Sequence, residues 1–153
     1  MEYQEKFMKK AYNLAKKAYE IDEVPVGAVI VKNGEVLSYA FNQKEKKSLA
    51  TAHAEILAIE KACKKLKDFR LIDCDLYVSL EPCVMCTGAI LSARIKNVYF
   101  GAYITNGSIS AKELCEKAEL NHKTNFEGGF MLEECSKLVS DYFKNKRDKR
   151  NNV

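Results

Sequence analysis

Two short segments combine metal-binding residue types with one that can carry protons. They are Thr51-Ala52-His53-Ala54-Glu55 and Glu81-Pro82-Cys83-Val84-Met85-Cys86. Cys83 and Cys86 are three residues apart at the expected start of a helix, so their sulfur atoms can lie on one face. The partial positive charge of a helix N-terminus favours thiolates over thiols. With the imidazole of His53 they make a three-ligand zinc site, and three protein ligands leave the fourth position for water, as in catalytic sites.

Glu55 would supply the proton carrier that such a site needs. Zinc lowers the pKa of its bound water to about 7. A nearby carboxylate can then take the water's proton and deliver it to a substrate. Residues two apart on a regular helix do not share a face, so His53 and Glu55 can reach one pocket only in the first turn of a helix. We therefore expect a helix to begin beside His53.

The Cys-x-x-Cys pair alone has two other common roles, as half of a structural zinc site or as a redox pair. A structural site needs a fourth ligand, and the other candidates stand alone in the sequence: Cys63, Cys74, Cys115, Cys135 and His122. We expect these cysteines to be buried free thiols and His122 to be solvated. A redox role would leave the His-Ala-Glu segment unexplained.

The elements around these segments alternate between helix and strand. Apolar residues recur every three or four positions from Tyr3 to Ala18, which predicts an amphipathic opening helix. Asn33-Gly34 is a strong hairpin signal between two strands. Pro82 is expected at the first position of a helix, where its missing N–H costs nothing. The remaining expected elements are strands at 26–32, 36–41, 76–80 and 98–100, a polar segment at 42–48, helices marked by 56–66, 111–117 and 132–143, and a loop containing Gly128-Gly129.

This order predicts an α/β fold in which helices cover both faces of a mixed sheet. Its 153 residues suit a single domain spanning 1–153. Hydrophobic residues make up 47% and charged residues 30%, which argues against disorder and coiled coil. No window approaches the ~18 consecutive apolar residues of a membrane span, and the first residues lack the apolar core of a signal peptide. Since six cysteines are also too few for a disulfide scaffold, we expect a cytoplasmic protein.

The net charge of +4 is concentrated at one end of the chain. Residues 144–153 form a basic C-terminal tail that carries the whole excess. Such a tail can be a solvated chain end, or it can contact the phosphates of a nucleic acid through Lys144, Lys146 and Arg147. Charge alone does not decide between these two interpretations.

The order His-x-Glu followed by Pro-Cys-x-x-Cys resembles the signature of the zinc-dependent nucleobase deaminases. Further segments make the likeness closest to the bacterial tRNA-specific adenosine deaminase family within the cytidine and deoxycytidylate deaminase superfamily. These segments are 24–29, 51–56, 70–72, 76–78, 80–86, 88–90, 100–102, 121–122 and the helix at 134–147. The resemblance covers nearly the whole chain.

The resemblance implies a three-layer α/β/α fold with a five-stranded mixed sheet, working as a homodimer. It implies hydrolytic deamination of the wobble adenosine in a tRNA anticodon to inosine, with one zinc ion per subunit and no organic cofactor. Carried over by position, the zinc ligands are His53, Cys83 and Cys86, and the proton shuttle is Glu55. Asn42 would contact the target base, and Val26 and Ala52 would line its pocket.

The sequence departs from this family at two places. Leu49-Ala50 stands where the family often has Asp-Pro. The segment 103–108 stands where the family has an Arg-Asp run that leads into a glycine-rich, RNA-binding stretch, and Ile104 replaces its acidic residue. The zinc chemistry is untouched, whereas the RNA contacts must differ.

Two other functions fit parts of the pattern. A deaminase of a free base or nucleotide, of guanine or cytosine type, would use the same zinc and the same Glu55. A non-catalytic, zinc-stabilised RNA-binding protein would keep the three ligands and have no need of Glu55. The basic last helix favours tRNA.

Overall fold

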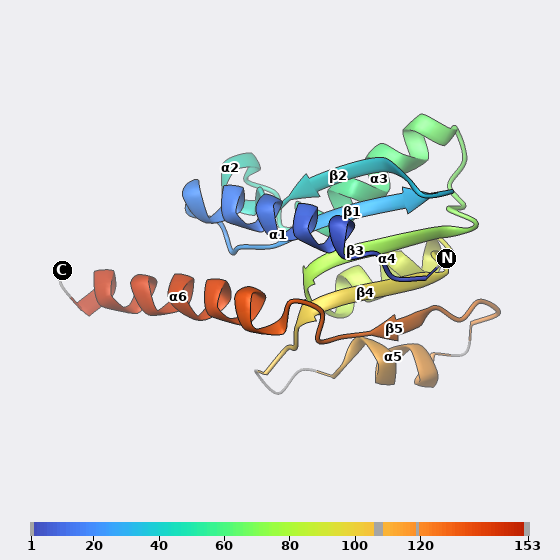
Figure 1. Ribbon diagram of the computed structural model, residues 1–153. Helices are drawn as coiled ribbons and strands as arrows, with labels where there is room; N and C mark the ends of the chain where they lie inside the picture. The colour runs from blue at the N-terminus through green and yellow to red at the C-terminus, as the bar shows by residue number, and fades with distance from the viewer. Residues whose placement is uncertain (1, 106–108, 119, 152–153) are drawn as a thin grey trace.

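Five strands form one mixed sheet at the centre of the protein, in the order β2-β1-β3-β4-β5 (Figure 1). The computed structural model describes residues 2–105, 109–118 and 120–151. β1 pairs antiparallel with β2 and β3, whereas β3–β4 and β4–β5 are parallel, which confirms the predicted mixed sheet. The strands are β1 (Gly27–Lys32), β2 (Glu35–Phe41), β3 (Cys74–Leu80), β4 (Asn97–Ala102) and β5 (Asn125–Glu127).

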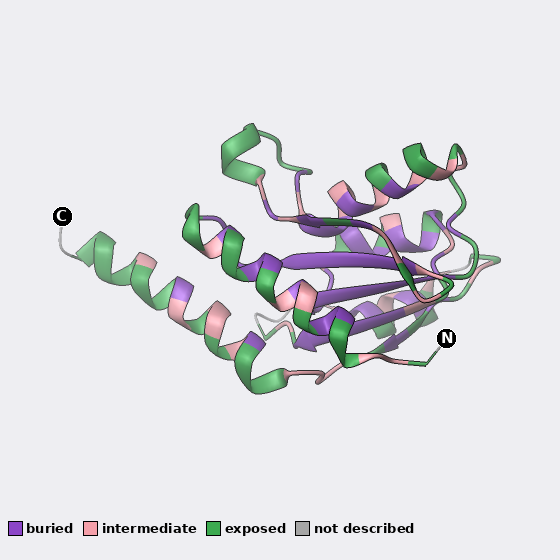
Figure 2. Cartoon of the chain, turned by 45° about the horizontal axis from the view of Figure 1, so that its top comes forward, coloured by how far each residue is buried: buried purple, intermediate pink, exposed green. Residues whose placement is uncertain are grey.

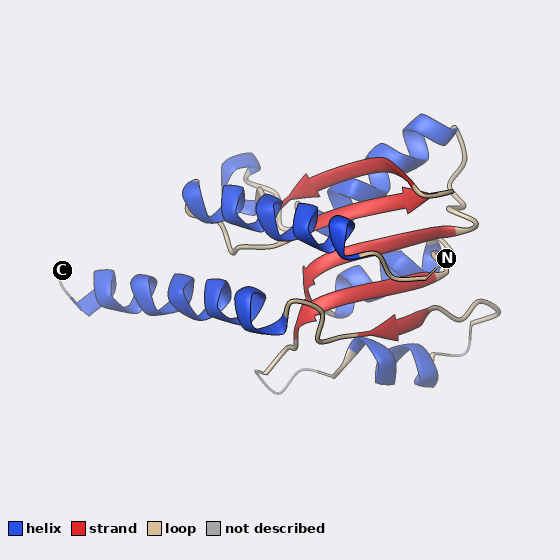
Figure 3. Cartoon of the chain, in the orientation of Figure 1, coloured by secondary structure: helices blue, strands red, loops and turns tan. Residues whose placement is uncertain are grey.

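Helices cover both faces of the sheet and give the expected three layers (Figure 3). On one face lie α1 (Glu5–Glu20) and α6 (Leu132–Asn151), which project beyond the sheet on the same side. On the other face lie α3 (Ala54–Leu66), α4 (Val84–Ser92) and α5 (Ala111–Lys117). A short helix, α2 (Lys44–Lys47), follows β2. Within the described chain, no helix is both long and apolar enough to cross a membrane.

Small residues let the helices lie close to the sheet. A Cβ atom on Gly27 would lie 2.1 Å from the carbonyl oxygen of Ala11 and 2.6 Å from the Cβ of Leu14. Glycine at this position therefore lets α1 rest directly on β1. On the opposite face, α3 turns three fully buried alanines toward the sheet: Ala54, Ala58 and Ala62. In Figure 2 the three central strands β1, β3 and β4 are almost entirely buried, whereas much of α6 is exposed.

Three elements differ from the sequence prediction. The polar segment after β2 contains α2, whose four residues are Lys, Glu, Lys and Lys and so show no apolar period. β5 was not predicted, because only Phe126 of its three residues is buried. Pro82 lies one residue before the N-cap rather than at the first helical position, since Cys83 has an extended backbone (φ −70°, ψ 176°) and α4 begins at Val84.

The isolated cysteines and His122 have structural environments. Cys74, Cys115 and Cys135 are buried free thiols, as predicted, and Cys63 is half-buried. The prediction that His122 is solvated was wrong. It is half-buried, and its Nε2 lies 2.9 Å from the carbonyl oxygen of Ile95.

The strand pairing brings three distant parts of the sequence to one edge of the sheet. Because β1 runs antiparallel to both neighbours, its first residues lie beside the last residues of β2 and β3. Gly27 pairs with Phe41, and Ala28 pairs with Val78. The chain that enters β1, the chain that leaves β2 and the chain that leaves β3 therefore meet at this edge. The carboxyl ends of β2 and β3 place the functional segments there, as is common in α/β folds.

Candidate active site

The two helices that begin at this edge bring three metal-binding atoms together. His53 is the N-cap of α3, Cys83 is the N-cap of α4, and Cys86 lies in the first turn of α4. The Nδ1 atom of His53 lies 3.7 Å from the Sγ of Cys83 and 3.6 Å from the Sγ of Cys86. All three ligand atoms lie within 4.8 Å of one another.

These distances fit a zinc ion. Zinc binds thiolate sulfur at about 2.3 Å and imidazole nitrogen at about 2.0 Å in a tetrahedral arrangement, which separates a nitrogen and a sulfur ligand by about 3.6 Å. The observed distances from His53 agree with that value. Two cysteines and one histidine are also a donor set that zinc prefers, and the set leaves a fourth position for water.

The start of α3 explains how His53 and Glu55 share one pocket. His53 lies outside the helix with an extended backbone (φ −76°, ψ 151°), and Glu55 is the second helical residue. The restriction on residues two apart does not apply, because only one of the two belongs to the helix. Both side chains line the same cavity. The expectation that a helix begins beside His53 is confirmed.

The side chain of Asn42, rather than that of His53, caps the start of α3. The side chain of His53 makes no capping bond to α3. Instead, the Oδ1 of Asn42 accepts a 2.7 Å hydrogen bond from the backbone N–H of Ala54, one of the donors that a helix start leaves without a partner. The backbone N–H of Asn42 donates in turn to the carbonyl of Val26 at 3.1 Å. Asn42 thus ties the end of β2 to the start of α3.

Burial and hydrogen bonds set the protonation of the site. The Cys86 thiol donates to Cys83 and lowers the pKa of Cys83 to about 4, and His53 adds to this effect. The same hydrogen bond raises the pKa of Cys86. A divalent cation among these atoms favours the deprotonated form of both thiols. Glu55 is 4% exposed, and burial raises its pKa to about 7.

A cavity of about 270 Å³ opens at these residues. Of the predicted site residues, His53, Glu55, Cys83, Asn42 and Val26 line it. Cys86 is fully buried behind its wall. Ala52 is buried and is not among the lining residues, so its predicted place in the pocket wall was wrong. The backbone carbonyl of Ala52 accepts a hydrogen bond from the N–H of Gln43.

Eight residues of the cavity wall were not predicted from the sequence. They are Glu23, Val24, Lys44, Glu45, Leu80, Glu81, Ile104 and Tyr142. A signal was present for two of them. Glu81 is a lone carboxylate after an apolar strand, Glu23 lies beside the apolar segment that enters β1, and each precedes a proline within two residues. An acidic residue in such a place is buried only if it has partners.

The predicted RNA-binding residues divide into two groups. Lys144 and Arg147 line a groove beside the cavity, together with the exposed rings of Tyr103 and Phe143. The groove and the cavity share three lining residues: Val24, Leu80 and Ile104. The predicted departure at 103–108 lies partly here, although residues 106–108 lie outside the described residues.

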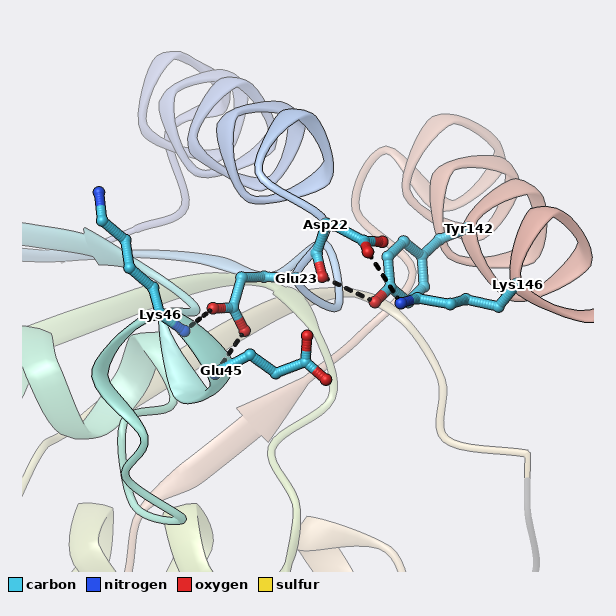
Figure 4. Close-up of polar contacts among 6 residues, drawn as sticks. All are labelled: Asp22, Glu23, Glu45, Lys46, Tyr142 and Lys146. Carbon is cyan, nitrogen blue, oxygen red and sulfur yellow. Dashed lines mark hydrogen bonds and ion pairs between the residues drawn. The ribbon is translucent and has the colours of Figure 1, made fainter. Parts of the chain in front are cut away.

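Lys146 lies elsewhere on α6 and has a partner within the chain. Its Nζ is 2.9 Å from the Oδ2 of Asp22, which lies two residues beyond the end of α1 and precedes Glu23 (Figure 4). The hydroxyl of Tyr142 donates to the backbone carbonyl of Asp22 at 3.1 Å. These contacts fasten the middle of α6 to the end of α1.

Comparison with known proteins agrees with the fold and the site. Residues 1–102 match the sequence model of a protein family, the cytidine and deoxycytidylate deaminase zinc-binding region. The tRNA-specific adenosine deaminase of Bacillus subtilis is 42% identical over 152 residues, covering 98% of this chain and 94% of that protein. A solved structure from studies of A-to-I editing by tRNA:A34 deaminases at the wobble position superimposes with a TM-score of 0.84 at 38% identity, over 88% of this chain and 99% of the other.

A guanine deaminase structure from Bacillus subtilis also superimposes, with a TM-score of 0.63 at 44% identity, over 67% of this chain and 66% of the other. The more complete matches are to the tRNA enzymes. The chain belongs to the cytidine and deoxycytidylate deaminase family and, within it, to the tRNA-specific adenosine deaminases.

We predict that the purified protein binds one zinc ion per chain and that Cys86→Ser lowers its zinc affinity by at least about 100-fold. Loss of an outer-shell partner of a ligand already costs about 10–100-fold, and a lost ligand costs more. Metal content is measured after dialysis against a chelator. Cys63→Ser is the matched control, because Cys63 is a half-buried thiol away from the site. Full zinc content in Cys86→Ser would contradict the assignment.

Proposed function

We propose that this protein deaminates the wobble adenosine of a tRNA anticodon to inosine by hydrolysis, without an organic cofactor. The observation that carries the proposal is the juxtaposition of two features. The buried Glu55 shares a cavity with His53 and Cys83, and that cavity adjoins a groove lined by basic and aromatic side chains. The similarity over nearly the full chain to tRNA-specific adenosine deaminases supports the same activity.

In this proposal His53, Cys83 and Cys86 bind zinc, and Glu55 moves the protons. Zinc, when bound, supplies a Lewis acid that lowers the pKa of a coordinated water to about 7. The carboxylate of Glu55 takes a proton from the attacking water and passes it to the N1 atom of the adenine ring. It then moves a proton to the amino group at C6, and ammonia leaves. Burial raises the pKa of Glu55 to about 7, which suits a group that must both accept and donate a proton near neutral pH.

Asn42 is proposed to orient the base. Because its Oδ1 already accepts the N–H of Ala54, its amide nitrogen is the group left to donate to an acceptor on the base. Val26 offers an apolar surface to the base within the same cavity. Ala52 supports the pocket from behind its wall rather than by contact.

The groove outside the cavity favours an RNA substrate over a free base. A free guanine or cytosine needs only the cavity. The bases that flank a flipped nucleotide in an anticodon loop can stack on exposed aromatic rings, and their phosphates attract basic side chains. Tyr103 and Phe143 offer such rings, and Lys144 and Arg147 offer the charges. We propose further that residues 1–153 act as one domain in the cytoplasm, where tRNA is found.

We predict that the protein converts adenosine to inosine at the wobble position of an anticodon stem-loop and that Glu55→Gln retains zinc while its kcat falls by about 10²–10⁴-fold. Loss of a positioned proton carrier typically costs that much. Turnover is measured by inosine formation, with free guanine, adenosine and cytidine as competing substrates. Glu60→Gln, an exposed position on the same helix, is the control.

Three results would contradict parts of this proposal. Activity on a free base with none on the stem-loop would favour the deaminase of free bases. Unchanged turnover in Glu55→Gln would exclude the proton-shuttle role. Stem-loop binding without any turnover would favour the non-catalytic RNA-binding protein.

The basic residues of α6 differ in their surroundings, so we expect them to contribute differently to RNA binding. We expect the double variant Lys144→Ala with Arg147→Ala to weaken stem-loop binding and to reduce the salt slope of log K by about 0.7 per lost phosphate contact, because released counterions set this slope. Lys146→Ala should change the slope much less, since Lys146 already pairs with Asp22. Binding is titrated at several salt concentrations. If the wild type and the double variant have equal salt slopes, the basic tail does not contact phosphates and is a solvated helix end.

We propose finally that two copies of the chain form a homodimer. Val84 and Met85, which lie between the two cysteines, are 51% and 37% exposed, and a second copy could bury this apolar surface. Light scattering is expected to give the mass of two chains for the wild type and of one chain for Val84→Glu with Met85→Lys. A wild-type protein that scatters as a single chain would refute the dimer.

A further inference from the structure

Two irregular segments outside the sheet form part of the cavity wall. The segment that follows β2 contributes Asn42, Lys44 and Glu45, and the segment that follows β4 contributes Ile104. Neither segment is held by strand pairing. Something else must therefore keep them in place around a bound base.

The carboxylate of Glu23 holds the first segment. Its Oε1 accepts the backbone N–H of Glu45 at 3.0 Å, and its Oε2 accepts the backbone N–H of Lys46 at 2.8 Å (Figure 4). These N–H groups belong to the first turn of α2, which has no side-chain cap from its own N-cap residue, Gln43. A helix of four residues has little stability of its own. Glu23 therefore anchors the start of α2 to the chain that enters β1.

The carboxylate of Glu81 holds the second segment in the same way. Its Oε1 accepts the backbone N–H of Ile104 at 3.0 Å, and its Oε2 accepts the backbone N–H of Ala111 at 2.9 Å. Ile104 follows β4 closely and Ala111 is the first residue of α5, so one side chain joins the two ends of the connection between them.

Glu23 and Glu81 share three further properties. They are 2% and 5% exposed, and both line the cavity. Within the described residues, neither forms an ion pair with a lysine or arginine, so backbone N–H groups are their observed partners. Each also bonds directly to a residue that lines the cavity, Glu45 in one case and Ile104 in the other. Both carboxylates thus act on the shape of the cavity through the backbone.

We propose that Glu23 and Glu81 are a pair of positioning residues, each of which fixes with one buried carboxylate the backbone of one segment of the cavity wall. Neither donates or accepts a proton in the reaction. They keep the wall in the shape that orients the reacting base toward Glu55. This inference rests on the proposed function only for the identity of the base.

The test uses Glu23→Gln and Glu81→Gln in the full chain. An amide offers one acceptor oxygen and places a donor NH₂ against the second backbone N–H, so one hydrogen bond is lost in each variant. We expect kcat on the stem-loop to fall at least about tenfold in each variant, because small misplacements near the reacting groups are costly. KM should change less than about threefold, since phosphate contacts by α6 remain. Zinc content should stay at one ion per chain.

Hydrogen exchange supplies a readout that does not depend on the substrate. Glu23→Gln should lower protection at the start of α2, at the N–H of Glu45 or of Lys46, and leave it unchanged at Ile104 and Ala111. Glu81→Gln should show the reverse pattern. Asp68→Asn is the matched control, because the Oδ1 of Asp68 also accepts a backbone N–H, that of Arg70 at 3.0 Å, but beyond the far end of α3. It should leave kcat unchanged.

Two outcomes would overturn the proposal: kcat equal to that of the wild type, or a fall in kcat that is matched by loss of zinc or of protection throughout the chain. If a glutamine variant does not fold, Glu23→Asp and Glu81→Asp replace it, because a shorter carboxylate keeps its charge but cannot reach both N–H groups. A wild-type protein that is inactive on the stem-loop would refute the proposed function alone. The exchange patterns would still decide whether these carboxylates hold the two segments.

Discussion

The whole site depends on two helices that begin at one point on the edge of the sheet. His53 and Cys83 are the residues at which α3 and α4 start, and neither side chain caps its own helix. Both turn toward a common centre instead, where Cys86 joins them from the first turn of α4. A helix start normally uses its N-cap side chain to satisfy a free backbone N–H. Because these two side chains face the metal site, backbone N–H groups at the helix starts need hydrogen-bond acceptors from other residues.

Side chains from elsewhere in the chain satisfy backbone N–H groups at three helix starts around the site. Asn42 reaches from the end of β2 to the first N–H of α3. Glu81, immediately before Pro82 and Cys83, accepts the first N–H of α5. Glu23 accepts two N–H groups at the start of α2. The site is thus surrounded by helix starts whose free donors are satisfied by side chains distant in sequence, and these hydrogen bonds hold the cavity wall together.

The three buried carboxylates of the cavity differ in what surrounds them. Glu23 and Glu81 each have both oxygens bonded to backbone N–H groups of neighbouring segments, which fixes their orientation. Glu55 lies beside the metal ligands, and burial raises its pKa to about 7. A group with that pKa can exchange protons near neutral pH, whereas a carboxylate held by two N–H groups is suited to holding structure. One residue type thus has two roles in one cavity, and its partners decide which role it takes.

The sequence by itself determined most of the elements and predicted the zinc ligands and the proton carrier, because these depend on local spacing. Cys83 and Cys86 are three residues apart, His53 precedes a helix, and Asn33-Gly34 turns a hairpin. Only the tertiary structure decided which basic residues of α6 face the groove, since Lys146 pairs with Asp22, 124 positions away. It also decided that Ala52 is buried outside the cavity lining, that His122 bonds to Ile95, and that Glu23 and Glu81 bond to the backbone of two segments of the cavity wall. Contacts between distant residues follow from how helices pack on the sheet, which no local period in the sequence encodes.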